Sequence, residues 1–275
     1  MNQIKRIGIT GLVGFMGTHL KDRLSREKEI EVLPFEDSFF ENPDALMDFA
    51  RKADVIVHLA GVNRHEPQVV YQKNIDLMQQ LLNCVDASGN KPYILFSSST
   101  QIERDNEYGR GKKKAMELLQ QWSQKNNTPA VSMVIPNVFG DGGRPFYNSV
   151  VATFCHQVTH GQEPKIDKDG RMTMIYINDL VEDMYHLIQS PPAGYKIEHI
   201  NPRAEVQVSE ILALLNKFKD AYYDSGMVPA IKSSFERDLY NTFITYMDTA
   251  DWERHLKRNT RSEERRVGKE CRSRW

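Results

Sequence analysis

The stretch that decides the fold is Thr10-Gly11-Leu12-Val13-Gly14-Phe15-Met16-Gly17, which directly follows the apolar run 4–10. Gly11 permits a tight turn, Gly14 lets backbone N–H groups approach a pyrophosphate, and Gly17 allows close packing of a helix on a strand. Because the trio stands between a strand pattern and a helix pattern, it predicts a dinucleotide-binding turn. Phe15 and Met16, at the start of that helix, are included among the candidate cofactor-binding residues.

Strand and helix patterns alternate on both sides of this turn. Apolar runs lie at 4–10, 30–35, 55–60, 93–98 and 130–135, and helical patterns lie between them at 17–26, 43–52, 68–87 and 108–125. Strands nearly continuous in Ile, Val and Leu and separated by helices are typical of a parallel sheet covered on both faces. The sequence therefore predicts an α/β protein with a Rossmann-type, doubly wound sheet.

The later part of the chain divides between that sheet and a second lobe. Residues 174–177 and 195–200 are expected to return to the sheet, separated by a helix that begins at residue 178 or 179. Residues 1–140, with returns from 171–200, then form the NAD(P)-binding domain. Residues 141–170 and 201–260 form a smaller substrate-binding lobe, which includes an amphipathic helix at 208–220.

Composition excludes several classes of protein. The 275 residues are 40% hydrophobic and 27% charged, with a net charge of −1 at pH 7, so nothing favours nucleic acid. No apolar run reaches the ~18 residues that cross a bilayer, and the first apolar segment starts too early for a secretory signal, so a cytoplasmic protein is expected. The three cysteines are widely spaced, and the one helical histidine pair, His156 and His160, lacks an acidic partner. No metal site is therefore expected.

Residues 261–275 read RSEERRVGKECRSRW, six basic and three acidic residues without apolar periodicity. The string resembles the in-frame translation of a sequencing-adapter oligonucleotide, and a basic disordered tail is the alternative. It is left out of the fold argument.

An acidic residue is expected after the second strand, where a carboxylate binds the adenosine ribose hydroxyls. Glu36 or Asp37 stands there, without a neighbouring arginine. A carboxylate at that position favours NADH over NADPH, and the alternative is a loop carboxylate in solvent.

Tyr108 and Lys112 form the one Y-x-x-x-K pattern of the chain. On a helix these two residues share a face, so the ammonium can stabilise the anion of a phenol that titrates near pH ~10 in water. Ser97-Ser98-Ser99 ends the preceding strand and places hydroxyls at the same edge of the sheet. We expect Tyr108 as acid, Lys112 as its neighbour and Ser99 as the hydroxyl that binds a carbonyl. The alternative is a serine-rich strand end beside an exposed Tyr/Lys pair.

Together these motifs resemble the extended short-chain dehydrogenase/reductase family. The resemblance is carried by the glycine turn, Val57-His58-Leu59-Ala60-Gly61, Asn74, Ser99, the Tyr108/Lys112 pair and Pro136-Asn137-Val138-Phe139-Gly140. Three longer strings, at 58–64, 147–155 and 235–240, are similar to the capsular polysaccharide reductases of this family that make a precursor of UDP-N-acetyl-L-fucosamine.

The resemblance implies reduction of the carbon-4 ketone of a UDP-linked 2-acetamido-6-deoxy hexose by NADPH, with NADH as the alternative cofactor. It also implies a homodimer formed through the helices at 68–87 and 108–125. The family's proteins carry a further zinc-binding cupin domain, which is expected to be absent from this chain. The implied cofactor-binding residues are Gly11, Gly14, Phe15, Met16, Gly17, Glu36, Leu59, Ala60, Gly61, Asn74, Tyr108 and Lys112. The substrate candidates are the neutral Asn63, Asn137 and Asn148, and, for the diphosphate, Arg64, Arg144 and Arg171.

A nucleotide-sugar 4-epimerase or dehydratase shares these motifs, and a dinucleotide-sensing module is a third alternative. A nucleotide-sugar 4-epimerase of the same fold would retain its dinucleotide and consume none. A dehydratase would need an acidic pair beside the strand hydroxyl, where the chain has Thr100-Gln101. A dinucleotide-sensing module without catalysis would not need the Tyr108/Lys112 pair.

Overall fold

The computed structural model describes residues 4–248. The described residues form two compact units, unit 1 comprising 4–138 and 177–202, and unit 2 comprising 139–176 and 203–248. The adapter-like string 261–275 and the end of the expected substrate lobe, 249–260, lie outside the described residues.

Unit 1 contains a six-stranded sheet in which every neighbouring pair is parallel. Its strand order is β2 (Ile30–Val32), β1 (Lys5–Thr10), β3 (Val55–His58), β4 (Tyr93–Ser99), β5 (Ala130–Ile135) and β8 (Tyr195–His199). The predicted Rossmann-type sheet and the return of 195–200 are thereby confirmed. The strand order reverses at β1, between β2 and β3, which is where open α/β sheets bind ligands at their carboxyl edge.

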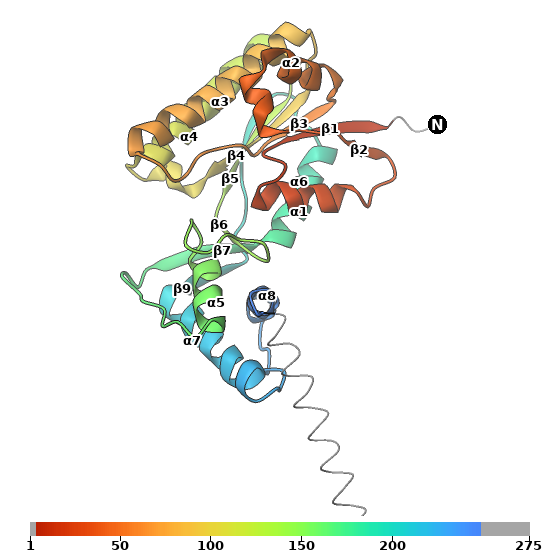
Figure 1. Ribbon diagram of the computed structural model, residues 1–275. Helices are drawn as coiled ribbons and strands as arrows, with labels where there is room; N and C mark the ends of the chain where they lie inside the picture. The colour runs from red at the N-terminus through yellow and green to blue at the C-terminus, as the bar shows by residue number, and fades with distance from the viewer. Residues whose placement is uncertain (1–3, 249–275) are drawn as a thin grey trace, which may run out of the picture. The chain divides into compact units, whose positions relative to one another are not determined.

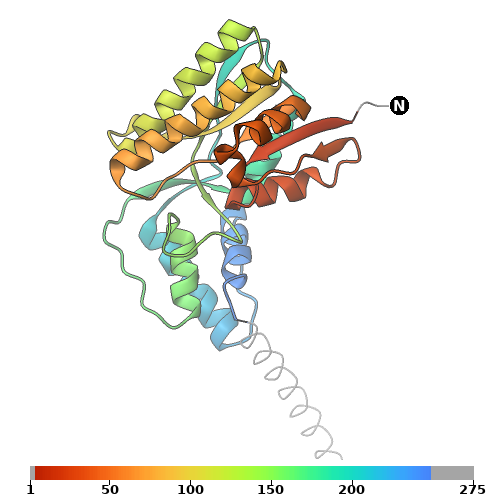
Figure 2. The same ribbon diagram turned by 45° about the horizontal axis from the view of Figure 1, so that its top comes forward.

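Helices cover both faces of this sheet (Figures 1 and 2). On one face lie α2 (Pro43–Lys52), α3 (Pro67–Ser88) and α4 (Glu107–Asn126), and on the other lie α1 (Phe15–Leu24) and α6 (Ile177–Gln189). The core under α2, α3 and α4 is apolar and includes Phe49, Met78, Phe96, Leu119 and Trp122. Burial of this surface is the dominant force that holds the helices on the sheet.

The ends of these helices have identifiable causes. The Asn42 side chain accepts a hydrogen bond from the Ala45 N–H (3.2 Å) at the start of α2, and that of Asn106 accepts one from the Gly109 N–H (2.8 Å) at the start of α4. Gly89, with φ of 73°, ends α3 in the left-handed conformation that glycine adopts without strain. These caps fix where the loops at the carboxyl edge of the sheet begin and end.

A second sheet has three strands in the order β6 (Asn137–Phe139), β7 (Arg171–Tyr176) and β9 (Ala204–Gln207). The expected return of 174–177 to the parallel sheet is therefore wrong. The place beside β5 is taken by β8, and β7 pairs antiparallel with β9 instead, with Arg171 opposite Gln207. An apolar run of this length does not reveal which sheet it joins.

The helices of unit 2 are α5 (Val150–Thr159), α7 (Val208–Phe218) and α8 (Ser234–Ile244), and a π-helical turn follows α7 at Lys219–Asp224. Their buried faces meet in an apolar core that includes Phe154, Ile211, Leu215, Leu239 and Phe243.

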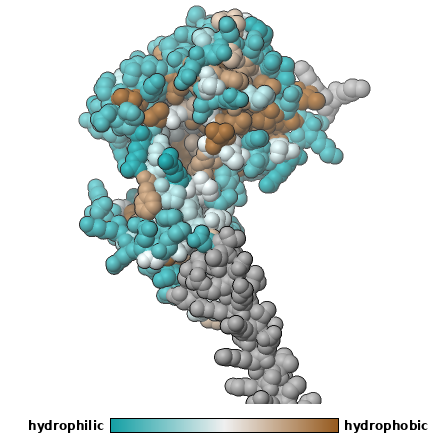
Figure 3. Space-filling view, viewed as in Figure 1, coloured by the Kyte–Doolittle hydropathy of each residue, from teal (hydrophilic) through white to brown (hydrophobic). Residues whose placement is uncertain are grey.

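On the face of unit 1 that Figure 3 shows, hydrophilic side chains are interspersed with smaller apolar areas. None of the helices within 4–248 has the length and hydropathy of a membrane span.

Candidate active site

The glycine turn between β1 and α1 depends on the absence of side chains. Gly11 has φ of 70°, and a Cβ on it would lie 2.9 Å from the backbone N of Ala60. A Cβ on Gly17 would lie 2.2 Å from the Gly11 carbonyl oxygen. The turn is closed by the Gly14 N–H, which donates to that same oxygen at 3.0 Å. The first turn of α1 therefore lies directly against the loop that precedes it, as predicted from the sequence.

The start of α1 is suited to an anion. Gly14 is the N-cap residue and supplies no side-chain cap, and the first turn contains no acidic residue. The first N–H groups of a helix lack intrahelical partners and carry partial positive charge, so they bind phosphate oxygens well. Phe15 and Met16, half-buried, open this first turn. These features fit the pyrophosphate of a dinucleotide.

Glu36 lies beyond the carboxyl end of β2, at the edge of the sheet next to β1. It is exposed, and its carboxylate accepts a hydrogen bond from the Ser38 hydroxyl at 3.3 Å. Asp37 is exposed as well and begins a short 3₁₀ turn, Asp37–Glu41. The position of Glu36 beside the reversal of strand order agrees with a ribose-binding role.

The loop after β3 is held to both neighbouring elements. The Leu59 N–H donates to the Thr10 carbonyl (3.2 Å), and the Ala60 N–H donates to the Thr10 hydroxyl (3.3 Å). The buried Asn74 amide, on α3, donates to the Val62 carbonyl at 2.6 Å. The predicted residues Leu59, Ala60 and Asn74 thus fix one loop beside the glycine turn.

The buried Asn74 Oδ1 has no hydrogen-bond partner among the described residues. A Cβ on Gly61 would lie 2.9 Å from that oxygen and 3.0 Å from Lys112 Nζ. The bare backbone of Gly61 therefore leaves a small space that a carboxamide and an ammonium both border. An unpartnered buried oxygen is costly, so a ligand hydroxyl or a water fits here.

Lys112 is the most unusual side chain of unit 1, because only 3% of it is exposed. Its ammonium donates to the Ser97 carbonyl at 2.9 Å and lies 4.8 Å from the centre of the Phe96 ring and 5.8 Å from that of Tyr108. Burial lowers the pKa of Lys112 from 10.5 to about 8. A buried ammonium beside a tyrosine ring is the arrangement expected from the Y-x-x-x-K spacing.

The serines at the end of β4 differ in what their hydroxyls do. Ser97 and Ser98 are buried, and their hydroxyls donate to the His58 carbonyl and to Met116 Sδ. Ser99 is half-buried, and its hydroxyl accepts from the Gln101 N–H at 3.2 Å. Of the three, Ser99 is the one whose hydroxyl proton is left for a ligand by the contacts described, which favours the predicted choice.

Gly109 is a residue that the sequence reasoning missed. A Cβ on it would lie 2.1 Å from the Gln101 carbonyl oxygen. Glycine therefore lets α4, which carries Tyr108 and Lys112, approach the turn that follows Ser99. The signal was present as a glycine in a helical pattern, where that residue is otherwise unfavourable.

The predicted substrate residues are divided between the two units. In unit 1, Asn63 and Asn137 are half-buried, Arg64 is exposed, and the buried Asn63 Oδ1 has no hydrogen-bond partner among residues 4–248. In unit 2, Arg144 and Asn148 are exposed, and Arg144 lies 5.4 Å from the centre of the Tyr147 ring. Arg171 forms a 3.3 Å ion pair with Glu205 across β7 and β9, which reduces its positive charge toward a diphosphate.

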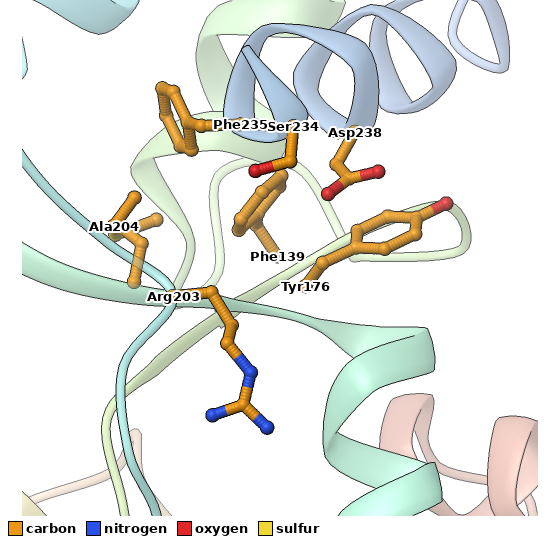
Figure 4. Close-up of a pocket in the computed structure, with 8 residues that line it drawn as sticks. Phe139, Tyr176, Arg203, Ala204, Ser234, Phe235 and Asp238 are labelled. Carbon is orange, nitrogen blue, oxygen red and sulfur yellow. The ribbon is translucent and has the colours of Figure 1, made fainter.

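Unit 2 also contains a small pocket of about 10 Å³, room for about one water, that the sequence did not predict. Figure 4 shows Asp238 and Ser234 of α8 beside the rings of Phe139 and Tyr176, with the Arg203 guanidinium directed away. Asp238 is 6% exposed and pairs with Arg237 at 3.0 Å. None of the six predicted substrate residues lines this pocket. A sequence signal existed in the string 235–240, which carried the resemblance but received no role.

The chain matches the model of the NAD dependent epimerase/dehydratase family over residues 7–201. It is 33% identical over 246 residues to UDP-2-acetamido-2,6-beta-L-arabino-hexul-4-ose reductase of Pseudomonas aeruginosa. The aligned region covers 88% of this chain and 65% of that protein. The structure is similar to capsular polysaccharide assembling protein CapF from Staphylococcus aureus, with a TM-score of 0.77 and 30% identity over 90% of this chain and 66% of that one. RMD from Pseudomonas aeruginosa, complexed with NADPH, shares the fold at a TM-score of 0.74 and 19% identity, over 90% of this chain and 99% of that one.

Proposed function

The chain belongs to the NAD dependent epimerase/dehydratase family, and from that premise we propose that it reduces the carbon-4 ketone of a UDP-linked 2-acetamido-6-deoxy hexose with NAD(P)H. The chain spans 65% of the length of the curated reductase that it matches, so the proposal concerns the reductase part of such a protein. The observation that carries it is the buried Lys112 ammonium, placed between the end of β4 and the Tyr108 ring.

The dinucleotide supplies the hydride when it is bound, and the residues at the carboxyl edge of the sheet fit it. Gly11 and Gly17 leave no side chain in the turn, and the N–H groups at the start of α1 face a phosphate without competition from an acidic residue. Lys112 and Asn74 border the space beside Gly61, where hydroxyls of a ribose would find a donor and an acceptor.

Proton transfer is assigned to Tyr108. The phenol donates its proton to the oxygen of the former ketone, and the Lys112 ammonium stabilises the resulting phenolate through its charge. A Lys112 pKa of about 8 keeps this side chain mostly protonated at neutral pH, as the role requires. Ser99 donates its hydroxyl proton to the substrate carbonyl and so orients it.

The substrate lobe is assigned to unit 2. Arg144 and Asn148 are exposed and available to the UDP group, whereas Arg171 must first exchange its ion pair with Glu205. Asp238 and Ser234 border a pocket with room for about one water, so we assign them to a single hydroxyl of the substrate. In unit 1, Asn63, Asn137 and Arg64 remain substrate candidates.

The choice between NADPH and NADH rests on opposed arguments. The family resemblance implies NADPH, whereas the exposed Glu36 carboxylate would repel a 2′-phosphate. The two arguments are separated by measuring turnover with each dinucleotide in the wild type and in Glu36→Ala. If the carboxylate repels a 2′-phosphate, its loss raises the ratio of kcat/KM for NADPH to kcat/KM for NADH.

The test of the function is net consumption of NADPH or NADH with a panel of UDP-4-keto sugars, with the product analysed by NMR. We expect stoichiometric oxidation and a carbon-4 alcohol. Interconversion of two UDP-sugars without net oxidation of the dinucleotide would instead identify an epimerase. Tight dinucleotide binding without turnover of any sugar would identify a sensing module.

A further inference from the structure

We propose that His58, which no catalytic step above uses, is a positioning residue that joins the glycine turn to the Phe96 ring against which the Lys112 ammonium lies. The proposal rests on the function proposed above only in the role it gives to Lys112. It concerns a row of buried side chains at the carboxyl edge of the sheet, defined as Thr10, His58 and Phe96.

The strand register places these three residues side by side. Thr10 of β1 pairs with His58 of β3, and His58 pairs with Phe96 of β4. Residues in register on neighbouring parallel strands point to the same face of the sheet. The row therefore crosses three strands at their ends and begins at the residue that precedes Gly11.

Each neighbour in the row is in direct contact with the next. Thr10 Oγ1 and His58 Nδ1 share a 2.7 Å hydrogen bond, while the same hydroxyl accepts from the Ala60 N–H. The His58 and Phe96 rings are stacked at 5.5 Å between centroids and 23° between planes. Lys112 Nζ lies 4.8 Å from the centre of the Phe96 ring. All four side chains are at most 3% exposed.

The row works with a neutral imidazole. Burial and the nearby Lys112 charge lower the pKa of His58 to about 3. Around the ring, β1 contributes the Thr10 hydroxyl, β4 the Phe96 ring and the Ser97 hydroxyl on the His58 carbonyl, the 3₁₀ turn after β2 the Phe40 ring, and α4 the Lys112 ammonium. Lys112 is the one charged group that these contacts bring toward His58. A protonated ring would repel it.

The two contacts of His58, the hydrogen bond to Thr10 and the stack on Phe96, have separable consequences. The bond to Thr10 holds the hydroxyl that binds the Ala60 N–H, and so fixes the loop beside the dinucleotide turn. The stack on Phe96 fixes the ring under the ammonium and keeps water away from it. Because burial is what lowers the pKa of Lys112, water admitted beneath Phe96 would raise it.

Two substitutions of His58 each remove one of these contacts and keep the other. In His58→Asn, the amide occupies the place of the Nδ1 side of the ring and keeps the bond to Thr10, but the stacked ring is lost. In His58→Phe, a ring remains to stack on Phe96, but the bond to Thr10 is lost. Thr10→Val, which is nearly isosteric, removes the same hydrogen bond from the other side together with the acceptor of the Ala60 N–H, and is the comparison variant.

Three quantities are measured in the full chain: the pKa of Lys112, the Kd for NADPH and kcat. The pKa is followed by NMR of isotope-labelled lysine side chains, with Lys112→Arg used to assign the signal, so this readout does not depend on turnover. We expect His58→Asn to raise the pKa of Lys112 by about half a unit or more. We also expect kcat to fall about tenfold, because the admitted water screens the ammonium charge from the Tyr108 phenolate, with little change in Kd.

For His58→Phe we expect an unchanged pKa of Lys112 and a Kd raised by about two- to tenfold, the effect of one lost hydrogen bond. Thr10→Val should raise Kd at least as much, because it also removes the acceptor of the Ala60 N–H, and the double variant His58→Phe/Thr10→Val should equal Thr10→Val. The proposal is overturned if His58→Asn leaves the lysine titration unchanged, or if the effects of His58→Phe and Thr10→Val on Kd are additive. If the wild type binds NADPH but reduces no UDP-keto sugar, and the two His58 variants still change the pKa of Lys112 and the Kd as expected, the proposed function is refuted and the role of His58 stands.

Discussion

Unit 1 and unit 2 hold their polar side chains in opposite ways. In unit 1, Lys112 and Asn74 are 3% and 2% exposed and lie at the ends of parallel strands. In unit 2, Arg144, Asn148 and Arg171 are exposed, and Asp238 is the buried exception among the described candidates. Burial shifts the pKa of a charged group and strengthens its interactions, whereas an exposed charge is screened by water.

This difference indicates where chemistry and recognition reside. A buried ammonium that costs free energy to maintain is a feature of a catalytic group. Exposed arginines and asparagines with small individual energies are suited to binding a flexible, charged substrate. We therefore expect substitutions in unit 1 to affect dinucleotide binding and rate, and substitutions in unit 2 to affect KM for the sugar.

The largest expected effect on dinucleotide binding comes from Gly17→Ala. The new Cβ would lie 2.2 Å from the Gly11 carbonyl oxygen, so α1 must move away from the turn. Loss of two charge-assisted hydrogen bonds to phosphate costs roughly 3 kcal/mol, or about 100-fold in Kd for NADPH. Gly194→Ala, also in unit 1, meets nothing within 4 Å and is the control for calorimetric titration. Equal affinity of the two variants for NADPH would show that the dinucleotide does not bind at this turn.

Acid is expected to weaken unit 1 through His58. The His58 pKa of about 3 in the folded state lies below the usual histidine value of 6.5, so the unfolded state takes up the proton first. Stability contributed by the neutral ring is complete above pH 6.5 and is lost as pH falls toward 3. Its upper bound is about 5 kcal/mol, at 1.36 kcal/mol per pKa unit. Native-state hydrogen exchange of β3 and β4 amides should show a weaker acid dependence in His58→Asn, whereas His156→Asn in unit 2 should leave it unchanged.

A smaller effect is expected from Asp238→Asn in the pocket of unit 2. Loss of one charged hydrogen bond to a substrate hydroxyl costs about 1.5 kcal/mol, which corresponds to roughly tenfold in KM. The Kd for NADPH should not change. If Asp238→Asn altered the affinity for NADPH and left KM for the sugar unchanged, the division of roles between the units would be contradicted. The control outside the pocket is Ser209→Ala, at the start of α7.

The sequence could predict the glycine turn because backbone constraints define it. Gly11 needs a positive φ, and Gly17 needs the absence of a Cβ, and both demands are visible as residue types. The Tyr108/Lys112 pair was visible for a similar reason, since helical spacing places the two residues on one face. The depth to which Lys112 is buried was not visible, because it depends on β4 and the loop after β3.

Elements whose partners lie far apart in the chain were not predictable. The run at 174–177 was apolar enough for either sheet, and its pairing with β9 depends on residues about 30 positions later. The ion pair of Arg171 with Glu205 follows from that same pairing. The pocket around Asp238 is assembled from β6, β7, β9 and α8, so no local pattern in the sequence could identify it.

Proton donation by Tyr108, beside the buried Lys112 ammonium, is the step on which the proposed ketone reduction depends. Its most direct test is kcat of Tyr108→Phe with NADPH and a UDP-4-keto sugar, measured together with the Kd for NADPH. We expect kcat to fall about 100-fold or more, the usual contribution of a general acid, and Kd to change by less than about threefold. Turnover that survives within a few-fold of the wild type would contradict it.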